Sequence, residues 1–90
     1  MNEKKPLSVL ETGKMDIEKR YTVEIEEFGK RLRALRERQQ LSQLDLELKS
    51  GINRTEISRI ENGQKNIEFF TIVKLATALD TTLSQLFAVV

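Results

Sequence analysis

The sequence predicts an all-α protein of five helices preceded by an N-terminal extension, and three observations support this fold class. Apolar residues recur at spacings of three and four, the period of one helix face. Residue types that cap helix N-termini stand before these runs, and glycines stand where helices must stop. The chain has 90 residues, 39% hydrophobic and 32% charged, which fits one small globular domain rather than a disordered chain.

The composition argues against an enzyme and against a metal or cofactor site. The chain has no cysteine, which excludes disulfides and thiolate zinc sites. It also has no histidine, the commonest general base and metal ligand, and its carboxylates and lysines form no recognisable paired set. No apolar run reaches membrane-spanning length and no secretory signal begins the sequence, so we expect a cytoplasmic protein without cofactors.

The first helix is expected to be long. Residues 1–15 show no sustained period and are expected to form a mobile tail. From a capping residue at Asp16, one face carries the apolar residues Ile17, Tyr21, Ile25, Phe28, Leu32 and Leu35. An alternative starts the helix at Glu26 or Glu27, because β-branched residues alternate with polar ones near Thr22. We favour the long helix, with residues 1–25 as an N-terminal extension and residues 26–90 as the domain.

Start and stop signals place the other four helices. Ser42 and Asp45 form a capping box for a short second helix, which Gly51 ends. Asn53 begins the third helix, with Glu56 completing a second box, and Gly63 ends it. The fourth helix is marked by Phe69, Ile72, Val73, Ala76 and Leu79. A third box at Thr82 and Gln85 leads Leu83, Leu86 and Phe87 into the fifth.

Residues 42–62 carry the functional signal, since two short helices joined by a glycine-containing turn are typical of a helix-turn-helix. The inward positions of this unit are apolar: Leu46, Ile52, Ile57 and Ile60. The outer face of its second helix is polar: Arg54, Thr55, Ser58, Arg59 and Asn62. An arginine can bond both acceptors of a guanine edge, and threonine can contact a base, so this face predicts major-groove DNA recognition.

The stretches Phe28-Gly29-Lys30-Arg31-Leu32-Arg33, Leu41-Ser42-Gln43 and Ile57-Ser58-Arg59-Ile60-Glu61-Asn62-Gly63, with Gly51 and Leu75-Ala76, resemble the lambda-repressor-like (Cro, XRE-type) family over about residues 26–87. The resemblance implies its compact five-helix fold and base contacts by Arg54, Thr55 and Arg59. It also implies a buried ion pair between Arg36 and Glu61. Phosphate contacts are expected from the helix ends and the following loop, at Gln43, Asn53, Ser58, Asn62, Lys65 and Asn66.

The sequence departs from the family pattern at a few positions. Glu47 stands where the family usually has a small residue, and a carboxylate there must turn outward from the closely packed helices. Leu44 and Leu48 fall on the solvent side of the second helix, and Phe70 takes a position that is usually polar. These three residues could form a surface for a protein partner. Single exposed apolar side chains are also normal, and we favour that interpretation for the two leucines.

The family commonly binds palindromic operators as homodimers, and surplus apolar residues offer material for an interface: Ile17, Tyr21, Phe70, Leu86, Phe87, Val89 and Val90. The sequence therefore predicts a nucleoid-associated transcriptional regulator that binds double-stranded DNA as a homodimer. One alternative is an antitoxin-like adaptor that grips a protein partner with the same fold. Another is a protein-interaction module that no longer binds DNA. Arg31, Arg33 and Arg38 are interpreted as solvated helix charges.

Overall fold

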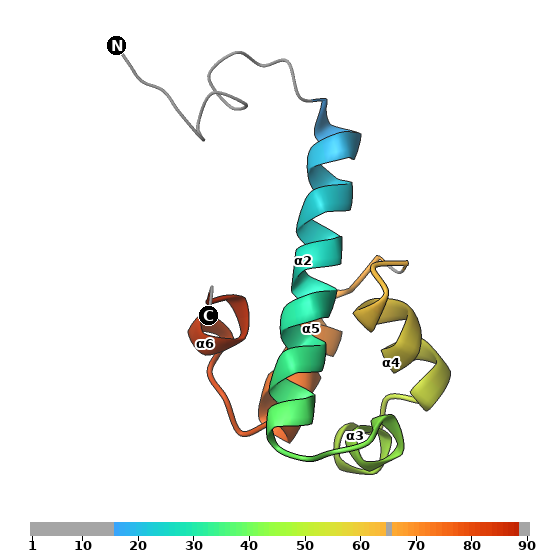
Figure 1. Ribbon diagram of the computed structural model, residues 1–90, viewed down its shortest axis with the longest axis vertical. Helices are drawn as coiled ribbons and strands as arrows, with labels where there is room; N and C mark the ends of the chain where they lie inside the picture. Colours follow the sequence, from blue (N-terminus) through green and yellow to red (C-terminus); the bar gives the residue numbers. More distant parts are fainter. Residues whose placement is uncertain (1–15, 65, 89–90) are drawn as a thin grey trace.

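The computed structural model describes residues 16–64 and 66–88, and all regular secondary structure in this part of the chain is helical. The helices are α2 (Ile17–Arg38), α3 (Gln43–Ser50), α4 (Arg54–Glu61), α5 (Phe69–Ala78) and α6 (Leu83–Phe87). Helix α2 packs against α4 and α6, α3 packs against α4 and α5, and α5 packs against α6. Figure 1 shows α2 as the long central helix, with α3 and α4 on one side of it and α6 on the other. The predicted five-helix, all-α fold is confirmed.

Helix α2 runs without a break through Thr22 and Val23, so the alternative start at Glu26 or Glu27 is not observed. Its N-cap is Asp16, whose side chain accepts a hydrogen bond from the Lys19 amide at 2.8 Å. The first turns stand clear of the other helices (Figure 1), which leaves Ile17 82% exposed. Within the described ranges, neither α2 nor any other helix combines the length and the apolar character needed to cross a membrane.

Most of the residues predicted to cap helices form the expected capping hydrogen bonds. Ser42 and Asp45 form a reciprocal capping box, and the amide of Ser42 lowers the pKa of the Asp45 carboxyl by donating a hydrogen bond to it. Thr82 and Gln85 form a second one. The described residues show only half of the box expected at Asn53: its Oδ1 accepts from the Glu56 amide at 2.8 Å.

The core lies between α2, the helix-turn-helix and α5–α6. Its fully buried large side chains come from all five helices: Leu32, Leu46, Ile57, Ile60, Leu75, Leu79 and Leu86. The rings of Phe28 and Phe87 close one side of it, with centroids 5.1 Å apart. Leu86 has 0% exposure, so its expected place in a dimer interface was wrong. Helix α6 is short and turns this side chain into the protein's own core, where α2 and α5 meet it.

The buried face of α5 includes only some of the apolar residues that marked this helix in the sequence. Phe69 and Val73, two of the residues that marked this helix in the sequence, are exposed, whereas Thr71 and Leu75 are buried. The buried row is therefore Thr71, Leu75 and Leu79, at a spacing of four, with Ala76 beside it. The apolar pattern does not identify this face, because Thr71 carries a hydroxyl and Phe69 lies at the exposed first position of the helix.

Candidate nucleic-acid interface

The unit formed by α3, the turn and α4 is held together by the apolar residues expected from the sequence. Leu46, Ile52, Ile57 and Ile60 are all buried. Gly51 ends α3 with φ at 78°, a left-handed conformation that glycine adopts at little cost. The chain can therefore change direction at Gly51 and Ile52 and begin α4 directly after its cap, Asn53.

The outer face of α4 presents polar side chains to solvent. Asn53, Arg54, Thr55, Arg59 and Asn62 are exposed, and Ser58 is half-buried. Within residues 16–64 and 66–88, neither arginine has its guanidinium in an ion pair. Their donors are therefore available, and a guanidinium fork matches the two acceptors of a guanine in the major groove. This is the chemistry expected of a helix that reads base edges.

A buried polar network fixes the far end of α4 to α2 and α3. Arg36 pairs with Glu61, as the resemblance implied: Nε and Nη2 donate to the two carboxylate oxygens at 2.6 Å and 2.9 Å. Arg36 Nη1 also donates to the Leu41 carbonyl at 2.7 Å, and Gln43 Nε2 donates to Glu61 at 3.0 Å. The Glu61 hydrogen bond and charge raise the pKa of Arg36, although burial opposes that shift.

The absence of a side chain at Gly29 lets α2 lie directly on the end of α4. A Cβ placed on Gly29 would lie 2.4 Å from the Ile60 carbonyl oxygen and 2.6 Å from that of Glu61. Both are backbone atoms, which cannot turn aside as a flexible side chain can. The glycine is therefore required by close packing and not by its own backbone angles.

Several predicted phosphate-contacting side chains already hold local hydrogen bonds. The Asn62 amide donates to the Ser58 carbonyl at 2.9 Å, and Asn53 caps α4. Gln43 donates one hydrogen to Glu61, which leaves the second hydrogen of its amide group for another acceptor. These bonds hold Gln43 and Asn53 at helix N-termini, which suit phosphate oxygens, whereas Asn62 is held at the C-terminal end of α4.

The loop after α4 is tied to the N-terminal turns of α2. The hydroxyl of Tyr21 donates to Oδ1 of Asn66 at 2.9 Å, across 45 positions of the sequence. Asn66 was predicted to contact phosphate, whereas Tyr21 was assigned to the apolar stripe of the first helix and to the predicted dimer interface. Lys65, the other residue predicted in this loop, lies outside the described residues. Periodicity could not reveal this bond, because it depends on how the loop folds back.

Glu47 has a contact that the sequence analysis missed. Its side chain is half-buried, and Oε1 accepts a hydrogen bond from the backbone amide of Arg54 at 3.0 Å. The carboxylate thus turns toward the N-terminus of α4, so the prediction that it turns outward from the two helices was wrong. The unusual residue type at this position was the only signal available in the sequence.

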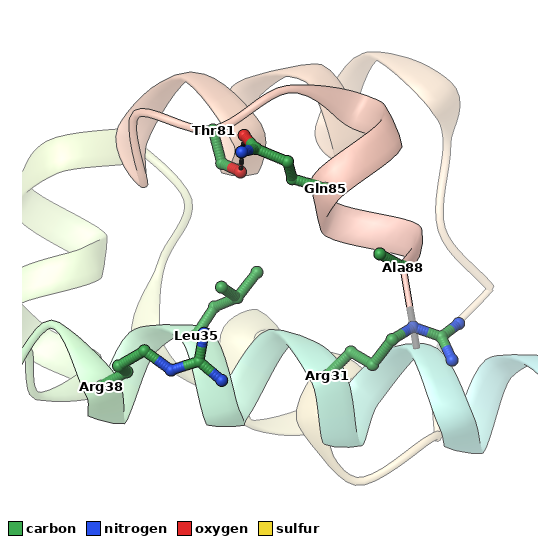
Figure 2. A pocket seen from close by; sticks show the side chains of 6 residues that line it. All are labelled: Arg31, Leu35, Arg38, Thr81, Gln85 and Ala88. Carbon is green, nitrogen blue, oxygen red and sulfur yellow. Dashed lines mark hydrogen bonds between the residues drawn. The ribbon is translucent and has the colours of Figure 1, made fainter. Parts of the chain in front are cut away.

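Other surface features lie away from the outer face of α4. Leu48 and Phe70 are 76% and 67% exposed, and Lys74 Nζ lies 4.9 Å from the Phe70 ring centroid. A hollow of about 240 Å³ lies between α2 and the α6 region. Figure 2 shows the six residues that line it: Arg31, Leu35, Arg38, Thr81, Gln85 and Ala88. Among the described residues, no group of acidic side chains is arranged to hold a metal ion.

Comparison with known proteins agrees with this geometry. The family described as "Helix-turn-helix" matches residues 32–86, more than half of the chain. The chain belongs to this helix-turn-helix family. The XRE-type resemblance noted in the sequence is thereby confirmed, and the match includes both motif helices, Arg36 and Glu61.

Relatives within the helix-turn-helix family have regulatory names. The control protein C.MunI from Mycoplasma sp. is 39% identical over 62 residues, which cover 68% of this chain and 84% of that protein. The HTH-type transcriptional repressor RghR of Bacillus subtilis (strain 168) is 48% identical over 56 residues, 61% of this chain but 42% of RghR. The crystal structure of the restriction-modification controller protein C.AhdI from Aeromonas hydrophila superposes with a TM-score of 0.70. That match has 43% identity and covers 72% of this chain and 98% of that one.

Proposed function

We propose that this protein is a transcriptional regulator that recognises a palindromic operator in double-stranded DNA and binds it as a homodimer. The observation that carries the proposal is the outer face of α4. There, Arg54, Thr55 and Arg59 are exposed on a helix whose other face is buried and whose end is fixed by the Arg36–Glu61 pair. The names of the relatives, a transcriptional repressor and two control proteins, support the same class of function.

Selection of bound sites from a pool of random duplex DNA tests the proposal. We expect enrichment of one sequence arranged as an inverted repeat, because two-fold dimers read two half-sites about 34 Å apart. Binding to that selected duplex should weaken steeply with added salt, since cationic side chains displace counterions from phosphates. A pool that stays random after several rounds would contradict sequence-specific binding.

The role of Arg59 as a base contact gives a quantitative prediction. Arg59→Ala should cost about 1–3 kcal/mol on the selected duplex and little on random duplex, because a contact to a base edge favours one sequence whereas a phosphate contact does not. Lys65→Ala is the comparison variant, and its assignment rests on the sequence. It should weaken both duplexes equally and reduce the salt slope by about one unit per site. Fluorescence titrations at several salt concentrations would measure both effects; equal losses on both duplexes for Arg59→Ala would make it a phosphate contact.

The homodimer is also testable. A single recognition helix contacts too few base pairs to select one site in a genome, which favours paired half-sites. Exposed apolar residues remain available for an interface at Ile17, Tyr21, Phe70 and Phe87; Val89 and Val90, also assigned to it from the sequence, lie outside the described residues. We expect native mass spectrometry to find two chains per selected duplex. A single chain on the whole palindrome would exclude this assembly.

An adaptor that binds a protein partner is a second candidate, favoured by the exposure of Leu44 and Leu48 one turn apart on α3. Phe70 offers a further exposed apolar side chain on α5. Such an adaptor could bind DNA as well, so DNA binding does not separate the two functions. They differ in whether Leu48 contacts a protein partner. Only an adaptor would lose a partner on Leu48→Ser while keeping its affinity for DNA.

A further inference from the structure

Glu47 bonds to both sides of the turn between the two motif helices. Its backbone carbonyl accepts from the Gly51 amide at 2.8 Å, as expected near the end of α3. Its carboxylate accepts from the Arg54 amide at 3.0 Å, the first amide of α4. In residues 16–64 and 66–88, side chains accept from the first amide of α4, that of Arg54, and from the third, that of Glu56. Asn53 is the cap of α4 itself, whereas Glu47 belongs to α3.

The bond between Glu47 and the Arg54 amide constrains the orientation of α4 relative to α3, which apolar packing alone leaves adjustable. Contacts among Ile52, Ile57 and Leu46 hold the helices together but depend little on orientation. A hydrogen bond from a backbone amide to a carboxylate is directional and charge-assisted, and the positive end of the helix dipole strengthens it. Helix α4 has only eight residues, so a small tilt at its first turn redirects Arg54 and Thr55.

We infer that Glu47 is a positioning residue for DNA recognition: its bond to the Arg54 amide sets the approach of the first turn of α4 and thereby increases discrimination between the operator and other DNA. This inference rests on the proposed function. The bond acts on sequence preference, because it orients side chains that face bases. The negative charge of Glu47 acts differently, since it repels the phosphates of every duplex alike.

Two substitutions separate the bond from the charge. Glu47→Gln keeps an oxygen acceptor for the Arg54 amide and removes the charge. It should raise affinity for all duplexes by one common factor and leave the operator-to-random ratio unchanged. Glu47→Ala removes both, and its ratio should fall about tenfold, the size of one poorly read base pair at about 1.4 kcal/mol. Glu56→Gln is the matched control: it removes a half-buried carboxylate from the same turn, has no part in the bond and should keep the ratio.

The titrations use full-length protein on the duplex selected by the wild type and on a scrambled duplex of equal composition. Thermal melts show that each variant is folded, and hydrogen exchange of the Arg54 amide reports the bond without DNA. We expect faster exchange in Glu47→Ala than in Glu47→Gln. An unchanged ratio in Glu47→Ala, or an equal loss in Glu47→Gln, overturns the inference alone. A wild type that prefers no duplex overturns the proposed function and the inference together.

Discussion

The Arg36→Ala variant is expected to lose about 3–5 kcal/mol of unfolding free energy, because it leaves the buried carboxylate of Glu61 without its charged partner. Both side chains of the pair are at most 8% exposed, so water cannot replace the lost donors. The substitution also removes the donor to the Leu41 carbonyl, which fixes the loop before α3. A domain of this size has about 5–15 kcal/mol in total, so much of the variant should be unfolded on modest heating.

Arg38→Ala provides the control for the same kind of substitution in the same helix. Arg38 is exposed, and within the described residues it has no ion pair, so its removal should cost less than about 1 kcal/mol. Urea titrations followed by circular dichroism would give both values. If the two variants unfold at the same urea concentration, the Arg36–Glu61 pair contributes nothing beyond an exposed charge.

The Gly29→Ala variant is expected to lose on the order of 3 kcal/mol, although alanine is the better helix former. The added methyl would stand 2.4–2.9 Å from three backbone atoms of Ile60 and Glu61, so α2 and α4 must move apart. That movement would also lengthen the Arg36–Glu61 bonds, which lie about two turns further along the same side of α2. Helix propensity alone predicts the opposite sign, and this makes the measurement decisive.

Gly51→Ala is the matched comparison, because its physical situation is reversed. A Cβ at Gly51 meets nothing within 4 Å, but the residue has φ at +78°. Its substitution should therefore cost about 1–2 kcal/mol of backbone strain without separating any helices. Scanning calorimetry on both variants would test the pair. A Gly29→Ala protein as stable as the wild type would show that α2 and α4 can separate freely.

The sequence predicted the features that depend on neighbouring residues. The caps at Asp16, Ser42 and Thr82 and the stop at Gly51 are local interactions within a few positions, so residue type and spacing were sufficient. The Arg36–Glu61 pair spans 25 positions and came only from the family resemblance. Periodicity could not predict which other helix packs against each helix face.

The features that the sequence analysis missed or misassigned all depend on how the helices pack against one another. Leu86 and Phe69 are both apolar residues in short helices, yet one is fully buried and the other exposed, because only Leu86 faces the other helices. The Glu47 bond and the Gly29 contact depend on the distance between two helices. No pattern within one helix contains that distance. Roles of individual residues toward DNA remain predictions from chemistry and position.

The sharing of Glu61 between Arg36 and Gln43 has a consequence for the thermodynamics of binding. These side chains lose their rotational freedom when the chain folds, so the entropy of ordering them is not spent again when a ligand docks. Association should then show a heat-capacity change that matches the contact area alone, without a contribution from coupled folding. If a substitution weakens these hydrogen bonds, the entropy of ordering the side chains must be lost when the protein binds its ligand. A variant that is less stable in the free state should then also bind more weakly.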